Sequence, residues 1–233
     1  MNLLALDTST DRSALGLITR AGAIFRVTSE PERRHGSDLL PRVRDLLEQA
    51  AMRVQDLDVI AVGLGPGSYT GLRVGVTAAK TLAYITGAAV VGIDSLEAIA
   101  RNATGALHIW VVADAQRGQV YTAEFERPAA DQPLVPRRRS QIDDLSEWSA
   151  RLDSSMLVLG PGLDKPHIRA AVRLGVVAED AAMNYPAGPG LVELARDEWN
   201  HGRRDDLWLI EPRYLRQSAA QEQWEARNPA TLQ

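Results

Sequence analysis

A pattern that occurs twice in this chain of 233 residues constrains its fold more than any other feature. In the first half an apolar strand ends in a turn at Asp7 and another strand follows; the same scheme recurs at Asp114, 107 residues later. An apolar strand also runs into Gly-Pro-Gly at Gly65 and again at Gly160, 95 residues later. An internal duplication would give two similar lobes facing each other across a cleft. The alternative is chance recurrence of two common features.

Strands and helices alternate along the chain, which indicates an α/β layer structure. Helices are predicted from about Leu39 to Ala51 and from Gly71 to Ile85, the second after a glycine-rich loop. We place the lobe boundary after residue 104, with an N-terminal lobe at 1–104 and a smaller C-terminal lobe at 105–233. The stretch 127–141, rich in Pro, Ala and Arg, is predicted to be an exposed excursion.

Composition and spacing exclude several classes of protein. The chain has no cysteine, which excludes disulfides, thiolate metal sites and cysteine nucleophiles. Its formal charge of −4 argues against a protein that grips nucleic acid by itself. No two of the four histidines have the spacing of a metal-binding helical pair. With no basic leader and no apolar run near the roughly 20 residues of a membrane span, we expect a cytoplasmic protein.

The turn after the first strand has two interpretations. Asp7, with Thr8 and Ser9 beside it, could hold a metal-bound water and let amides and hydroxyls approach a phosphate. The alternative is that these residues only build the turn. Asp114 has the same two interpretations. Asp7 and Asp114 facing each other across two lobes would be the layout of an actin-like ATPase cleft.

The helix after the glycine-rich loop carries a stripe of small residues. The loop lacks the Gly-Lys-Ser/Thr ending of a phosphate-binding loop. Small side chains recur every four positions and form one ridge of the helix, at Gly71, Gly75, Ala79 and Ala83. Such a ridge lets another helix approach closely. The neighbour is either part of the same lobe or a partner protein.

Several blocks of sequence together resemble the TsaB (YeaZ) family. These blocks are residues 4–10, 35–41, 61–75 and 92–98. The specific part is Gly-Pro-Gly-Ser with its Thr-Gly-Leu-Arg continuation, at residues 65–73. Residues 114–121, the second Gly-Pro-Gly and Tyr214-Leu215-Arg216 extend the similarity more loosely. The resemblance therefore covers most of the chain.

The resemblance implies a two-lobed actin-like fold with duplicated βββαβα lobes, the second reduced. It implies a non-catalytic subunit that binds and activates a TsaD-like paralogue, which transfers threonylcarbamoyl to adenosine next to the tRNA anticodon. A TsaE-like ATPase would complete the assembly, tRNA would be contacted only through the complex, and the isolated chain would form a homodimer. No cofactor is required. Asp7, Thr8, Ser9 and Asp114 would form a vestigial nucleotide site that binds ATP or ADP with magnesium weakly.

The resemblance also implies that the partner binds the first two helices of the N-terminal lobe. The residues predicted to contact it are Leu40, Val43, Leu47, Gly71, Leu72, Gly75, Ala79 and Ala83. No catalytic residue is assigned. The family is also described as peptidase-like, but the motifs supply neither a nucleophile nor a metal for that reaction. The competing hypothesis is an ATP-dependent small-molecule kinase or hydrolase of the actin-like fold.

Overall fold

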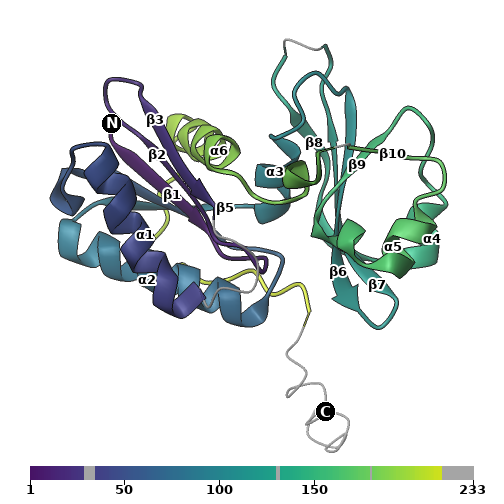
Figure 1. Ribbon diagram of the computed structural model, residues 1–233, viewed down its shortest axis with the longest axis horizontal. Coiled ribbons are helices and arrows are strands. Elements are labelled where there is room, and N and C mark those ends of the chain that lie inside the picture. Colours follow the sequence, from purple (N-terminus) through teal and green to yellow (C-terminus); the bar gives the residue numbers. More distant parts are fainter. Residues whose placement is uncertain (29–34, 130–131, 179, 217–233) are drawn as a thin grey trace, which may run out of the picture.

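The computed structural model describes residues 1–28, 35–129, 132–178 and 180–216. Within them the chain forms two five-stranded sheets, each belonging to one lobe, and the lobes lie side by side (Figure 1). The first sheet is built before residue 94 and the second between residues 108 and 177. The duplication predicted from the two recurring motifs is therefore visible as two separate layers.

The first sheet combines two antiparallel and two parallel pairings. Its strands are β1 (Leu3–Asp7), β2 (Ala14–Ile18), β3 (Ile24–Thr28), β4 (Val59–Gly63) and β5 (Ala89–Ile93). They lie in the order β3-β2-β1-β4-β5, with β1 parallel to β4 and β4 parallel to β5. Strands β1, β2 and β4 are buried along their whole length, as expected for a sheet covered on both faces.

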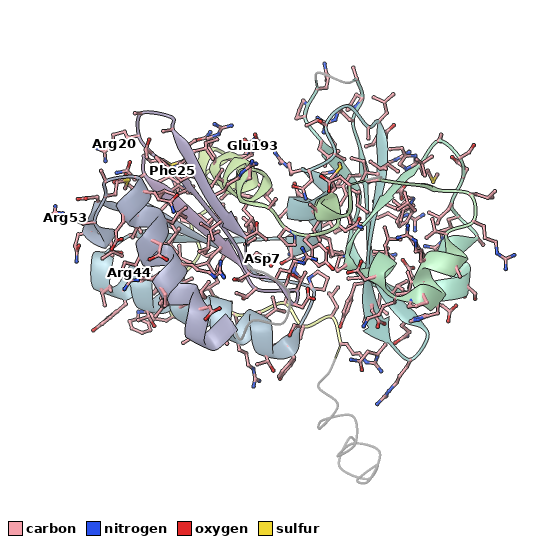
Figure 2. All side chains as sticks on the ribbon, viewed as in Figure 1. Asp7, Arg20, Phe25, Arg44, Arg53 and Glu193 are labelled. Atoms are coloured by element: carbon pink, nitrogen blue, oxygen red, sulfur yellow. The ribbon has the colours of Figure 1, made fainter. Side chains whose placement is uncertain are left out.

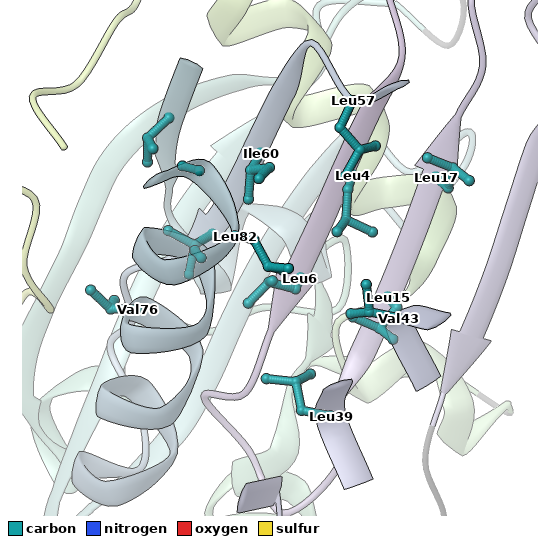
Figure 3. Close-up of a cluster of buried hydrophobic side chains, with 14 of the residues drawn as sticks. Leu4, Leu6, Leu15, Leu17, Leu39, Val43, Leu57, Ile60, Val76 and Leu82 are labelled. Carbon is teal, nitrogen blue, oxygen red and sulfur yellow. The ribbon is translucent and has the colours of Figure 1, made fainter. Parts of the chain in front are cut away.

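Two long helices cover one face of this sheet. They are α1 (His35–Gln49) and α2 (Tyr69–Thr86), and the 3₁₀ turn η1 (Val54–Asp56) follows the first. Ser68 caps α2 by accepting a hydrogen bond from the amide of Gly71, and Gly87 ends the helix in the left-handed region at φ 74°. Leucines and valines of both helices pack on the sheet in one apolar cluster (Figure 3).

The second sheet repeats the strand order of the first. Its strands are β6 (His108–Gln116), β7 (Gln119–Glu126), β8 (Val135–Asp144), β9 (Leu157–Leu159) and β10 (Val176–Val177). The order β10-β9-β6-β7-β8 is that of the first sheet read from the other edge. Its covering helices are short: α4 (Leu145–Ser149) and α5 (Pro166–Ala171), with the 3₁₀ turns η2 (Pro161–Asp164) and η3 (Ala181–Asn184).

The recurring motifs occupy equivalent places in the two sheets. Asp7 ends the first strand of one sheet, and Asp114 lies near the end of the first strand of the other. Gly65 and Gly160 each follow the fourth strand, and both have positive φ, 98° and 121°. Each lobe extends the predicted βββαβα order by a further strand and helix. The chain has the predicted two-lobed actin-like fold with a reduced second lobe.

The last helix of each half packs against the sheet of the other half. Helix α3 (Ser95–Ala100) contributes Leu96 and Ile99 to the core of the second lobe. Helix α6 (Gly188–Asn200) contributes Leu191 and Leu194 to the core of the first. The two helices thus cross between the lobes. The division after residue 104 stays a prediction, and α6 comes from beyond it while packing in the first lobe.

Two local expectations differ from the structure. Helix α1 begins at His35, before the predicted start at about Leu39, so Pro41 lies inside the helix. Residues 135–141 of the predicted excursion belong to strand β8, which pairs with β7, while residues 130 and 131 lie outside the described part. Arg137 and Arg138 form ion pairs with Glu126 and Glu124 of β7. Arginines and a proline suit this strand because it lies at the sheet edge.

Among the described residues, no helix has both the length and the apolar character needed to cross a membrane.

Candidate functional site

A cleft of about 710 Å³ lies between the lobes. The first lobe contributes Ser9 from the turn after β1 and Ser68 from the loop before α2. The second contributes Asp114 near the end of β6, Arg117 from the turn after that strand, and part of η2. Residues 213–216 line it as well. The cleft therefore lies beyond the carboxyl ends of the first strand of each sheet, where open α/β sheets commonly bind ligands.

Asp7 does not line this cleft, because it is fully buried behind the turn. Its Oδ1 accepts hydrogen bonds from the amide and hydroxyl of Ser9, at 2.8 and 2.6 Å. Its Oδ2 accepts one from the hydroxyl of Ser95 at 2.6 Å. A Cβ on Gly63 would lie 1.9 Å from Oδ2, so only glycine leaves room for the carboxyl group. Asp7 thus joins β1 to the start of α3. Figure 2 labels Asp7 in the first lobe, on the side that faces the second.

The surroundings of Asp7 disfavour its charged form. Burial raises the pKa of this carboxyl group, and the hydrogen bonds from Ser9 and Ser95 lower it by less. The nearby charge of Asp94 raises it further. A metal or a metal-bound water needs an ionised carboxylate with an available oxygen. Both oxygens of Asp7 are instead engaged by neighbouring hydroxyl and amide groups.

Thr8 and the small residues of α2 form a close contact. The hydroxyl of Thr8 donates to the carbonyl of Gly71 at 2.7 Å. A Cβ on Gly71 would lie 2.0 Å from the Thr8 carbonyl oxygen, and one on Gly75 would lie 2.3 Å from the Thr8 hydroxyl. Ala79 and Ala83 continue the ridge into the core of the first lobe. The ridge therefore packs inside its own lobe; that it also serves a partner stays a prediction.

The turn of the second lobe is more open than that of the first. Asp114 is half-buried, lines the cleft and accepts a hydrogen bond from the amide of Gln116 at 2.7 Å. Gln116, Arg117 and Gly118 all have positive φ, from 55° to 78°. Of the four residues predicted to bind a nucleotide, the structure brings Ser9 and Asp114 to the cleft. Asp7 and Thr8 lie buried behind it.

The eight residues predicted to contact a partner differ in exposure. Leu40, on α1, is 51% exposed. The other seven are buried, and they are Val43, Leu47, Gly71, Leu72, Gly75, Ala79 and Ala83. The buried residues fix how α1 and α2 lie on the sheet, so their effect on a partner would be indirect. Whether the set takes part in partner binding stays a prediction.

The sequence analysis missed an exposed apolar cluster beside α2. Tyr84 and Ile85 at the end of the helix are 67% and 59% exposed, and Trp208 and Leu209 are 71% and 78% exposed. The rings of Tyr84 and Trp208 meet edge to face at 5.7 Å. The spacing of Tyr69, Arg73, Lys80 and Tyr84 was a usable signal, since it places them on one stripe of the helix. No local pattern brings the segment after α6 to that stripe.

Candidate metal ligands are dispersed in the described part of the chain. There, no three His, Asp or Glu side chains gather in a group that could hold a metal ion.

Comparisons with known proteins agree on one family. The chain is 32% identical to the tRNA threonylcarbamoyladenosine biosynthesis protein TsaB of Bacillus subtilis, over 96% of this chain and 98% of the relative. It is 27% identical to the protein of the same name from Escherichia coli, over 94% and 96%.

A family model and solved structures add to this. The family model described as TsaD, tRNA N6-adenosine threonylcarbamoyltransferase, matches residues 27–135. YeaZ from Pseudomonas aeruginosa superimposes with a TM-score of 0.80 at 27% identity, covering 92% of this chain and 99% of that one. A second structure from that organism, described as similar to peptidase YeaZ, gives 0.78 at 27% identity, with the same coverage.

Proposed function

Since this chain belongs to the TsaB family and has a role in tRNA threonylcarbamoyladenosine biosynthesis, we propose that it is a non-catalytic subunit there, one that binds and activates a TsaD-like enzyme. The enzyme would transfer threonylcarbamoyl to adenosine next to the anticodon. The match of residues 27–135 to the TsaD model is consistent with two paralogous subunits of one assembly.

The observation that carries the non-catalytic part of the proposal is the environment of Asp7. This carboxyl group is fully buried, receives three hydrogen bonds from Ser9 and Ser95, and does not line the cleft. An acid in this position serves as a structural connection between β1 and α3. Asp114 would then face the cleft without the carboxylate of Asp7 opposite it.

The outer face of α1 and α2 supports the partner part of the proposal. The two helices lie side by side on the sheet (Figure 1). Leu40 on α1 and Tyr84 and Ile85 on α2 expose half or more of their surface. Contiguous exposed apolar side chains are typical of protein interaction sites, and Tyr84 contacts the exposed Trp208. We propose that the TsaD-like subunit binds this face.

The first experiment is co-purification of the chain with the TsaD-like protein of the same organism, followed by a threonylcarbamoyl transfer assay. We expect a stable complex and transfer that depends on this chain. A TsaD-like protein that is fully active alone would contradict the proposal.

Two exposed leucines provide a matched pair for the interface. Leu40, on α1, is 51% exposed, and Leu174, in the second lobe, is 63% exposed. We expect Leu40→Asp to weaken the complex at least tenfold, because a charge would be desolvated there. Leu174→Asp should leave the affinity unchanged. Equal effects of the two variants would mean that the partner does not bind α1.

The alternative is an ATP-dependent kinase or hydrolase, which the volume of the cleft and its arginines favour. In our proposal no cofactor is required, and ATP or ADP with magnesium binds weakly at Ser9 and Asp114. Calorimetry with and without magnesium separates the two: magnesium-dependent micromolar binding, reduced by Asp114→Asn, would support the enzyme.

The rest of the assembly follows from the same proposal. A TsaE-like ATPase completes it, and tRNA is contacted only through the complex, in the cytoplasm. The isolated chain forms a homodimer through the face that the partner would cover. Sedimentation of the free protein and of Leu40→Asp tests this, since the variant should shift the population to monomers.

A further inference from the structure

The segment after α6, residues 205–216, is fixed to the first lobe; we refer to it as the strap. The amide of Asp205 donates to the carbonyl of Val90 in β5 at 3.1 Å, and the Asp205 side chain accepts from the amide of Gly92 at 2.7 Å. Ile210 is 6% exposed and belongs to the core of the first lobe. The ammonium group of Lys80 on α2 donates to the Trp208 and Ile210 carbonyls. The start of the strap is therefore part of the first lobe.

The strap then reaches the other end of α2. Tyr214 stacks on Tyr69 with ring centroids 4.4 Å apart. The guanidinium group of Arg73 donates to both hydroxyl groups, at 3.0 Å to Tyr214 and 2.7 Å to Tyr69. The amide of Arg213 donates to the Leu64 carbonyl at 2.8 Å, next to the glycine-rich loop. These contacts hold the strap at the mouth of the cleft.

The end of the strap reaches the second lobe. The guanidinium group of Arg216 donates to the carbonyls of Ala115 and Gln116 at the end of β6, at 2.5 and 3.4 Å. Arg213 pairs with Asp94 at 3.1 Å, and Asp94 in turn accepts a hydrogen bond from Ser140 of β8 at 2.7 Å. The strap thus reaches the second sheet directly through Arg216 and indirectly through Asp94.

The strap also borders the cleft between the lobes. Residues 213–216 form part of its lining, so the strap is both a wall of the cleft and a connection across it. Figure 1 shows this last described part of the chain, in yellow, running from the first lobe toward the second. Rigid-body motion of two lobes about a hinge changes the width of the cleft between them. A segment fixed to both lobes restrains that motion.

We infer that the strap is a latch that holds the two lobes at a fixed separation, and that Arg216 is its attachment to the second lobe. Loss of the Arg216 contacts frees the second lobe to move and widens the cleft. The contacts through Arg213 and Asp94 give a second, weaker restraint. This inference concerns the isolated chain and does not depend on a partner protein.

The absence of cysteine allows two nitroxide labels to be placed without background labelling. We choose Glu48→Cys on α1 and Ala170→Cys on α5, because both positions are exposed and lie in different lobes. The distance distribution between the labels is measured by double electron–electron resonance. In the otherwise unchanged chain we expect one narrow distribution.

Arg216→Ala should broaden the distribution and shift it to longer distances, and Arg213→Ala with Arg216→Ala should broaden it further. The control is Arg20→Ala, which removes an arginine paired with Asp58 inside the first lobe and should leave the distribution unchanged. Unfolding curves show whether each variant is folded. If the folded double variant retains the narrow distribution, the latch does not exist. Broadening by the control as well would likewise overturn it.

Discussion

The two lobes share one strand order but differ in the helices that cover it. In the first lobe α1 and α2 have 15 and 18 residues and pack on the sheet through one large apolar cluster. In the second lobe α4 and α5 have five and six residues. A helix of one or two turns buries few side chains and is marginal by itself. The apolar cluster under α4 and α5 is smaller and contains two large rings, Trp110 and Trp148, whereas the cluster under α1 and α2 consists mainly of leucines and valines.

The two lobes also differ in how deeply the equivalent aspartates, Asp7 and Asp114, are buried. Asp7 is sealed by Ser9, Ser95 and the absence of a side chain at Gly63, while Asp114 stays half-buried at the cleft. The two lobes therefore share a strand order but differ in the surroundings of the aspartate in their first strand. In the first lobe the aspartate is buried and two long helices form the outer face. In the second lobe the turn near Asp114 faces the cleft.

The largest expected effect is in the second lobe, at Trp148. It is the one buried residue of α4, and its ring meets that of Trp110 at 6.4 Å. We expect Trp148→Ala to destabilise the protein by about 3–5 kcal/mol, because it leaves a large cavity under a short helix. Urea unfolding followed by circular dichroism measures the change.

Trp148→Phe is the matched control for that variant. The Trp148 indole N–H is buried and has no partner among the described residues, so a phenyl ring loses no hydrogen bond. We expect the phenylalanine variant to lose less than half as much stability as the alanine variant. Equal losses would show that ring volume is not what holds α4 in place.

In the first lobe, Gly75→Leu should destabilise by about 1–3 kcal/mol through overpacking. A side chain at this position collides with the hydroxyl of Thr8, whose Oγ1 would be 2.3 Å from the new Cβ. Thr77→Leu is the control, because Thr77 lies two residues further along the same helix, on its exposed opposite side. Thermal unfolding of both variants compares the two sides of α2.

The second measurement on the glycine variant is its affinity for the TsaD-like protein. We expect Gly75→Leu to abolish binding, by displacing α2 on its sheet. Normal binding by a folded Gly75→Leu protein would sink the idea that the small-residue ridge affects the partner face.

The duplicated strand order could be predicted because strands and Gly-Pro-Gly turns leave local signals in the sequence. The short pattern around Asp7 and Asp114 also predicted where the cleft lies. It could not predict that Asp7 is sealed, because Ser95 is 88 residues away and its approach depends on how α3 packs. Two further features could not be predicted: the packing of α3 and α6 on the opposite lobe, and the path of the strap along α2. Both depend on contacts between residues far apart in the sequence, which leave no local pattern.

The burial of Asp7 predicts that the stability of the protein depends on pH. Because burial raises its folded-state pKa above the ordinary value of 3.8, the folded protein holds this proton to higher pH than the unfolded chain does. Stability contributed at Asp7 is therefore present below the ordinary pKa and is lost as pH rises through the raised pKa. We expect wild type to lose stability relative to Asp7→Asn over that interval.

Urea unfolding of the two proteins at a series of pH values from 3 upward measures this difference. A stability difference between wild type and Asp7→Asn that does not change with pH would contradict a raised pKa.

The last comparison takes one ion pair from each lobe, and its exposed member has the smallest expected effect. Arg20 and Asp58 lie on the surface of the first lobe, with side chains 70% and 38% exposed, so Arg20→Ala should cost about 0–1 kcal/mol. Arg151 and Asp143 lie in the second lobe with side chains 34% and 8% exposed. Arg151→Ala leaves a carboxylate that is still buried, and we expect it to cost about 1.5–3 kcal/mol.

Adding 1 M salt should reduce the Arg20 effect more than the Arg151 effect, because exposed charges are screened more. If Arg20→Ala costs more than Arg151→Ala in urea unfolding, the reduced lobe does not rely on its few buried polar contacts.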